Sequence, residues 1–183
     1  RKEPMIIQYN VFTGQVPKES WIRGPEGGGR IIGEVCHFTD LCRFLAGSRV
    51  VQVFAQAAKP AGAAATIDDC LQISLSFADG SIAGICYTSI GCADLSKERV
   101  VVSCGGGTAV IDDFRETSFH SMKNPGRKSV QSKGFTEEME AFFGAIRKGA
   151  DAPVSYEELE ESSRVVFAVE ESLRKGLPVG LSP

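Results

Sequence analysis

One histidine has neighbours of the kind that proton transfer requires. His37 follows Glu34 by three residues and Arg30 by seven, so on a helix the three side chains would share a narrow arc. A neutral histidine near pH 7 can take a proton from an alcohol as hydride leaves. A glutamate one turn away can fix the histidine tautomer or raise its pKa. His37 and Glu34 are therefore candidates for acid–base catalysis, although a helical histidine beside a glutamate is more often structural.

Other reactive centres find little support in the sequence. His120 lies in a polar segment with Lys123 and Arg127, which is typical of a solvated loop. The six cysteines form no Cys-x-x-Cys pair, so neither a zinc ribbon nor a redox motif is predicted. Most of them lie in apolar runs, where a free cysteine packs as a small hydrophobic residue. We expect no metal site, and reduced cysteines in a cytoplasmic protein.

Two triple-glycine runs could suggest phosphate binding. Gly27-Gly28-Gly29 precedes a predicted helix, and Gly105-Gly106-Gly107 lies between two predicted strands. Neither run belongs to a G-x-G-x-x-G or P-loop motif. The first is expected to form a flexible loop beside a ligand or another domain, and the second to form a turn.

A predicted helix over residues 31–46 carries His37. Its apolar residues form a broad face, and Gly47 suits the position after a helix end. The loop before it, residues 13–29, contains Trp21, which either plugs onto a core or lines a pocket.

The middle of the chain alternates as β-strands do. We predict strands over residues 5–11, 49–57, 70–77, 82–90, 99–104 and 108–114. Asp79-Gly80 predicts a hairpin, because both residues tolerate positive φ. Residues 115–133 are polar and irregular, with room for one short edge strand.

The last third has helical periodicity. Five large apolar residues share one helical face: Phe135, Met139, Phe142, Phe143 and Ile146. The final helix begins with a capping box of Ser155 and Glu158 and ends before Gly176.

This order predicts one α+β domain over residues 1–183. Its sheet would be largely antiparallel and open, with helices packed on one face. Strand 82–90 is apolar on both sides, so we expect the other face to form a homo-oligomer interface.

Composition excludes several classes of protein. The formal net charge is −3 and no basic stripe occurs, which argues against nucleic-acid binding. No apolar run has the length of a membrane span. The chain has 43% hydrophobic residues, as a folded domain does.

Several stretches, in order, resemble a known family. Residues 27–41, Gly-Gly-Gly-Arg-Ile-Ile-Gly-Glu-Val-Cys-His-Phe-Thr-Asp-Leu, look like the histidine-bearing helix of the glucose–fructose oxidoreductase / inositol dehydrogenase / MocA family. Residues 77–81, 97–100, 109–114 and 153–179 agree with later parts of that family. The resemblance covers nearly the whole chain.

The resemblance implies a two-domain enzyme of which this chain is the second domain. An N-terminal Rossmann domain, missing from this sequence, would bind NAD or NADP and supply a catalytic lysine. The full-length enzyme would transfer a hydride between nicotinamide and a secondary alcohol of a sugar, inositol or nucleotide-sugar. This chain alone should lack dinucleotide affinity and turnover, because the phosphate-binding turn and the lysine are not in it.

The resemblance also assigns roles to individual residues. His37 matches the catalytic histidine, and Gly33 stands where the family commonly has an aspartate, so either Glu34 takes that role or it is vacant. Asn10 and Arg30 match places that often meet substrate or nicotinamide, and Trp21 would cap the pocket. The alternative is a stand-alone ligand-binding or scaffold domain without catalysis, which Gly33 mildly favours.

Overall fold

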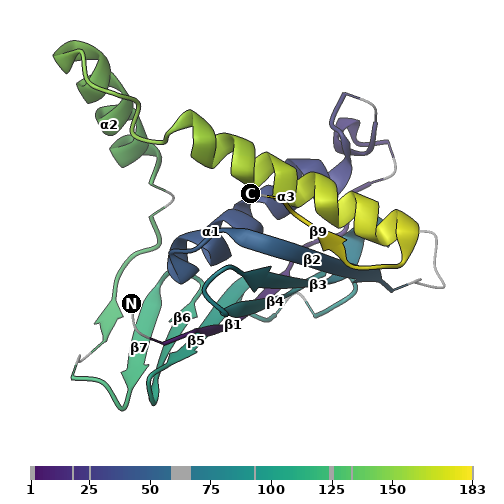
Figure 1. Cartoon of the computed structure of the whole chain (residues 1–183), viewed down its shortest axis with the longest axis horizontal. Helices are drawn as coiled ribbons and strands as arrows, with labels where there is room; N and C mark the ends of the chain where they lie inside the picture. Colours follow the sequence, from purple (N-terminus) through teal and green to yellow (C-terminus); the bar gives the residue numbers. More distant parts are fainter. Residues whose placement is uncertain are drawn as a thin grey trace.

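The alternating segments pair into one sheet that spans the domain (Figure 1). The computed structural model describes residues 3–17, 19–24, 26–58, 67–92, 94–123, 126–132 and 134–182. Within these residues the strands are β1 (Ile6–Phe12), β2 (Val50–Ala57), β3 (Cys70–Phe77), β4 (Ile82–Thr88), β5 (Glu98–Cys104), β6 (Gly107–Asp112), β7 (Glu116–His120), β8 (Arg127–Lys128) and β9 (Val179–Gly180).

The sheet is mixed and mostly antiparallel. Its order is β8-β7-β6-β5-β1-β4-β3-β2-β9, and β1 runs parallel to β4 while its other neighbour, β5, is antiparallel. The predicted α+β class with an open, largely antiparallel sheet is therefore confirmed. The segment 115–133 differs from its prediction, because it contributes both β7 and β8 to the edge of the sheet.

Both predicted hairpin turns are present, and they differ from the prediction in the conformation of one residue. Gly105 and Gly106 have φ of 57° and 77° and join β5 to β6, as expected. Between β3 and β4, Gly80 has a positive φ of 83°, while Asp79 does not. The Gly80 amide donates to the Phe77 carbonyl at 3.0 Å, so one glycine is enough to close this turn.

Three main helices accompany the sheet. They are α1 (Cys36–Ala46), α2 (Phe135–Lys148) and α3 (Tyr156–Lys175), with short helical turns η1 (Trp21–Arg23), η2 (Ile31–Val35) and η3 (Ile67–Asp69). The predicted capping box of α3 is present: Ser155 Oγ accepts from the Glu158 amide at 3.2 Å, and the Ser155 amide donates to Glu158 Oε2 at 3.0 Å.

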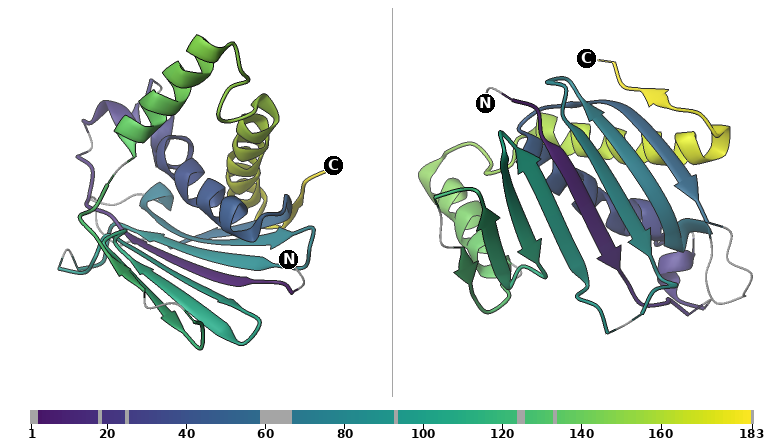
Figure 2. Two further views of the ribbon diagram at one scale, coloured as in Figure 1. Left: turned by 90° about the vertical axis from the view of Figure 1, so that its left-hand side faces the viewer. Right: turned by 90° about the horizontal axis from the view of Figure 1, so that it is seen from below.

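The core lies between the sheet and two of these helices, α1 and α3 (Figure 2). Ile7, Tyr9 and Val11 of β1 are buried on the helix side, whereas Ile6 and Gln8 point to the other side. Ser172 fastens α3 to the sheet, since its hydroxyl accepts from the Ala55 amide at 2.9 Å and donates to the Leu177 carbonyl at 2.8 Å.

The prediction that the helices pack on one face is met by α1 and α3 but not by α2. No residue of α2 is buried. In Figure 2, α2 lies on the helix side of the sheet in the left view and near the β7–β8 edge in the right view.

The opposite face of the sheet carries exposed apolar side chains. Ile6 and Ile82 are register partners in adjacent strands and are 54% and 47% exposed. The expected oligomer interface on this face remains a prediction.

Candidate functional site

A tightly packed loop leads into the helix that carries His37. A Cβ on Gly27 would lie 2.5 Å from the Cα of Ile22, so only glycine fits against η1. Gly28 and Gly29 follow with φ of 67° and 77°, a region that glycine enters at little cost. The first glycine run therefore lets the loop fold back onto its own backbone.

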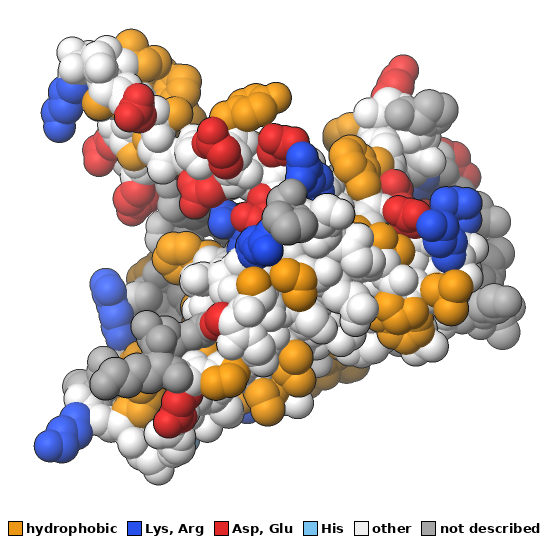
Figure 3. Space-filling view, in the orientation of Figure 1, with side chains coloured by type: hydrophobic (Ala, Val, Ile, Leu, Met, Phe, Trp, Pro, Cys, Tyr) orange, Lys and Arg blue, Asp and Glu red, His pale blue; other side chains and the backbone are white. Residues whose placement is uncertain are grey.

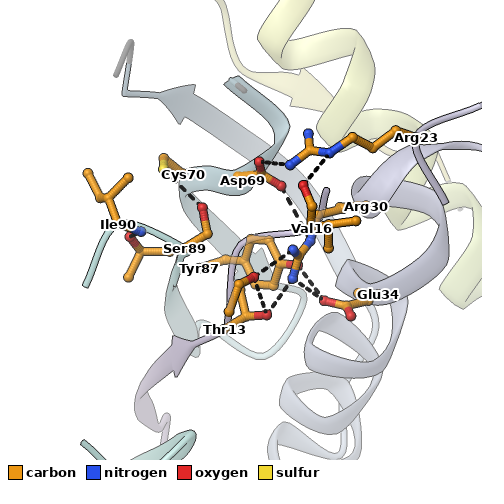
Figure 4. Close-up of polar contacts among 12 residues, drawn as sticks. Thr13, Val16, Arg23, Arg30, Glu34, Asp69, Cys70, Tyr87, Ser89 and Ile90 are labelled. Atoms are coloured by element: carbon orange, nitrogen blue, oxygen red, sulfur yellow. Dashed lines mark hydrogen bonds and ion pairs between the residues drawn. The ribbon is translucent and has the colours of Figure 1, made fainter. Parts of the chain in front are cut away.

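A buried arginine holds this loop, the start of the helix and the sheet together (Figure 4). Arg30 is 2% exposed. Its guanidinium donates to the Gly14 carbonyl and to Glu34 Oε2, each at 3.0 Å, and also to the hydroxyls of Thr13 and Tyr87. A direct contact between Arg30 and a substrate would require this cluster to open, so its predicted substrate-binding role stays a prediction.

A second arginine extends the cluster through a buried carboxylate. Asp69 is fully buried and lies 3.4 Å from Arg30 Nε and 2.6 Å from Arg23 Nη2. Arg23 also donates to the Val16 carbonyl at 2.9 Å. Two positive charges around one buried carboxylate compensate its loss of water. The cluster thus joins η1, η2 and η3.

The cluster also sets the charge of Glu34. Burial alone raises the pKa of this carboxyl, but the hydrogen bond from Tyr87 and the positive charge of Arg30 outweigh it, and Lys97 adds a smaller contribution. The pKa of Glu34 therefore lies below its usual value, and the group is ionised at neutral pH. Burial is the main cause that raises the pKa of Tyr87, and the Glu34 carboxylate raises it further. The phenol therefore stays protonated and donates a hydrogen bond to Glu34.

His37 lies apart from this network. It is exposed near the start of α1, and among the described residues no hydrogen bond or ion pair involves its imidazole. The residues just before it form one turn of π-helix, Ile31–Val35, in place of the predicted α-helical start. Such turns occur often at functional sites. Glu34 bonds to Arg30 and Tyr87, so the structure does not join Glu34 to His37 by a hydrogen bond.

The two remaining predicted residues lie in different surroundings. Asn10 is half-buried on β1 and alternates with the buried Tyr9, so it faces the side of the sheet away from α1. Phe38, next to His37, packs on the other side, 5.3 Å from the Tyr9 ring. The structure therefore separates Asn10 from His37. Trp21 is 68% exposed and does not enter the core.

Sequence reasoning missed the residues that hold the cluster from outside the helix. Tyr87 and Asp69 come from β4 and η3, far from Arg30 in sequence, and no local pattern links them. Lys97 stands beside Thr13 and Gly14 around a hollow of about 430 Å³ at the end of β1.

Among the described residues, no group of three or more metal-ligating side chains comes together, and no helix has the length and hydrophobicity needed to cross a bilayer.

The sequence profile of the GFO/IDH/MocA C-terminal domain matches residues 4–110. The chain belongs to the GFO/IDH/MocA family. Among curated proteins none matches this sequence.

Solved structures agree with this family assignment. The aldose-aldose oxidoreductase of Caulobacter crescentus, complexed with glycerol, superposes with a TM-score of 0.80 at 20% identity, covering 98% of this chain and 56% of its own. WlbA dehydrogenase of Bordetella pertussis, with NADH and UDP-GlcNAcA, gives 0.72 at 18% identity, covering 100% and 55%. UDP-N-acetylglucosamine 3-dehydrogenase GnnA of Acidithiobacillus ferrooxidans gives 0.75 at 14%, covering 94% and 54%.

These likenesses show a shared fold, and the chain spans a little over half the length of each of these proteins.

Gly33 lies four residues before His37, at the position where the resemblance to the GFO/IDH/MocA family led us to expect an aspartate. A Cβ on Gly33 would approach only the Gly27 carbonyl oxygen, at 3.7 Å, and its φ is not positive. The described residues therefore leave room for a Cβ at position 33.

Proposed function

We propose that this chain is the substrate-binding and oligomerising domain of an NAD(P)-dependent oxidoreductase. The reaction is hydride transfer between nicotinamide and a secondary alcohol of a sugar, inositol or nucleotide-sugar. The observation that carries the proposal is an exposed His37 that follows a π-helical turn, and the sequence resemblance matches this residue to the family's histidine.

The relatives support the class of substrate. The Caulobacter protein is an aldose-aldose oxidoreductase, and the Bordetella protein is a dehydrogenase seen with NADH and a UDP-sugar. All these substrates carry secondary hydroxyls whose oxidation requires removal of one proton and one hydride.

In this chemistry His37 is the proton acceptor. When the alcohol carbon loses a hydride to the cofactor and its C–O bond becomes C=O, the hydroxyl proton would pass to the imidazole of His37. In the reverse direction His37 returns the proton. Nicotinamide supplies the hydride chemistry, and this sequence has no G-x-G-x-x-G motif to hold it, so the cofactor would belong to an additional domain.

The Arg30 cluster fixes the backbone turn that leads into His37. Arg30 and Glu34 lie at the two ends of the π-helical turn, and their bonds to Thr13 and Tyr87 fix that turn against the sheet. We propose that Glu34 takes part in catalysis by positioning His37, because its bonds to Arg30 and Tyr87 hold the turn that precedes the histidine.

The outward face of the sheet is proposed as the interface with a second copy. Ile6 and Ile82 are exposed apolar partners in adjacent strands of this face, and exposed apolar patches on a folded domain mark interaction sites. The cytoplasm is the proposed location, on the basis of six free cysteines.

The test compares the two histidines of the chain in the polypeptide that the gene encodes. His37→Ala should lower kcat by about 10²–10⁴-fold, the usual contribution of a general acid–base group, and leave the oligomer intact. His120→Ala, a change of the same kind at an exposed position on β7, should leave kcat unchanged. Binding of sugars without turnover would instead favour a ligand-binding or scaffold domain.

A further inference from the structure

One helix, α2, presents an apolar face that the described residues of the chain leave exposed. The five apolar residues of α2 are each between 46% and 70% exposed, namely Phe135, Met139, Phe142, Phe143 and Ile146. Figure 3 shows hydrophobic side chains on α2 at the upper left of the molecule. Phe142 and Phe143 contact each other edge to face, 5.6 Å between ring centroids, but no residue of the helix is buried.

Such a helix needs a partner. It has 14 residues, and isolated helices of that length are only marginally stable in water. Glu137 and Glu138 near its start and Arg147 and Lys148 at its end favour the helix through its dipole, by a few tenths of a kcal/mol each. A continuous apolar face on one side and charges on the other are typical of a helix that packs against another folded unit.

The position of α2 indicates which unit that is. The apolar surface proposed for a second copy, around Ile6 and Ile82, lies on the opposite side of the sheet. The solved relatives, by contrast, continue well beyond the matched part, since this chain covers only 54–56% of the three structures described above. Helix α2 lies on the same side of the sheet as α1, which carries His37.

We infer that the apolar face of α2 is the docking surface for the additional domain of the longer polypeptide. The inference rests on the proposed function, because it requires such a domain beside His37. Helix α2 forms one wall of the interdomain contact and stands at the β8 end of the sheet. Domain interfaces within a chain bury on the order of 600–1,500 Å², and an apolar helix about 21 Å long supplies a substantial part of that area.

The experiment places the same pair of substitutions in two proteins. Met139→Gln with Phe143→Gln removes two apolar contacts and keeps helix propensity, and Glu137→Gln on the opposite side of α2 is the matched control. In the 183-residue chain, the double variant should leave the melting temperature within about 2 °C of the unchanged chain, because both side chains are already exposed. In the longer polypeptide that the gene encodes, it should make proteolysis between the domains at least about tenfold faster, while Glu137→Gln should not.

Three results would overturn the inference. One is an unchanged proteolysis rate in the longer polypeptide. Another is a change in the mass of the 183-residue assembly, measured by light scattering, which would assign the α2 face to a second copy. The third is a gene that encodes no additional domain. NADH binding, measured separately by fluorescence, distinguishes the two proposals: a domain that docks on α2 but binds no nucleotide would leave this inference intact and remove the proposed function.

Discussion

Replacing Arg30 by methionine tests whether the buried cluster holds the site together. The substitution keeps an unbranched side chain that reaches about as far as arginine Nε, and it removes the guanidinium that bonds to Gly14, Thr13, Tyr87 and Glu34. Arg30 is 2% exposed, so water cannot replace these bonds without opening the loop. We expect a large loss of stability and a mobile η2 turn.

The magnitude follows from the partners left behind. Breaking a buried ion pair by removing one partner costs about 3–5 kcal/mol. Asp69 keeps Arg23 at 2.6 Å, and the Glu34 side chain is about one-third exposed, so the lower end, about 3 kcal/mol, is expected. In a domain of this size, that corresponds to a melting temperature about 6–12 °C lower.

The assay is thermal and urea unfolding of the 183-residue chain, followed by circular dichroism at pH 7. Arg164→Met is the matched control, because Arg164 pairs with Glu160 on the surface of α3 at 2.7 Å. Exposed pairs contribute about 0–1 kcal/mol, so this variant should melt within about 2–4 °C of the unchanged chain. Equal shifts for the two variants would refute the structural role assigned to the Arg30 cluster.

Four further predictions follow from single positions. Glu34→Gln should cost about 1 kcal/mol at pH 7, and because the folded-state pKa of Glu34 is lowered, the difference should vanish as pH falls through that pKa, as urea unfolding across pH 2–7 would show. Gly27→Ala should destabilise by about 1–3 kcal/mol in the same assay, whereas Gly14→Ala, where a Cβ meets nothing within 4 Å, should cost less than about 0.5 kcal/mol. Gly33→Asp should fold with a melting temperature within about 2 °C of the unchanged chain, and a larger drop would contradict the room seen at that position. Ile82→Asp should weaken self-association at least about tenfold in sedimentation experiments, and an unaltered oligomer would move the interface elsewhere.

Local sequence patterns predicted most of the elements, because strand alternation and helix signals act over a few residues. The capping box at Ser155 and Glu158 and the glycine turn at Gly105 and Gly106 are confirmed at the predicted positions. One short edge strand was expected in residues 115–133, and the segment holds two, because Arg127 and Lys128 also pair with β7. The π-helical turn was also missed, and its ends, Arg30 and Glu34, bond to residues that are distant in sequence.

The site was harder to predict than the fold for the same reason. The sequence placed Arg30, Glu34 and His37 on one arc, but it contained no sign that Tyr87 and Asp69 would draw Arg30 into the interior and bond Glu34 as well. The periodicity of α2 correctly indicated a helix with one apolar face. It could not show that the described part of the chain would leave this face exposed, since packing partners are not encoded in periodicity.

Deuteride transfer tests the central claim most directly. The polypeptide that the gene encodes would be incubated with NADH or NADPH deuterated at C4, together with keto forms of aldoses, inositols and UDP-hexoses, and the products examined by mass spectrometry. The account predicts deuterium on one carbinol carbon of one of these classes, at a rate reduced about 10²–10⁴-fold by His37→Ala and unchanged by His120→Ala. Transfer that proceeds equally well without His37, or no transfer to any of these classes, would contradict it.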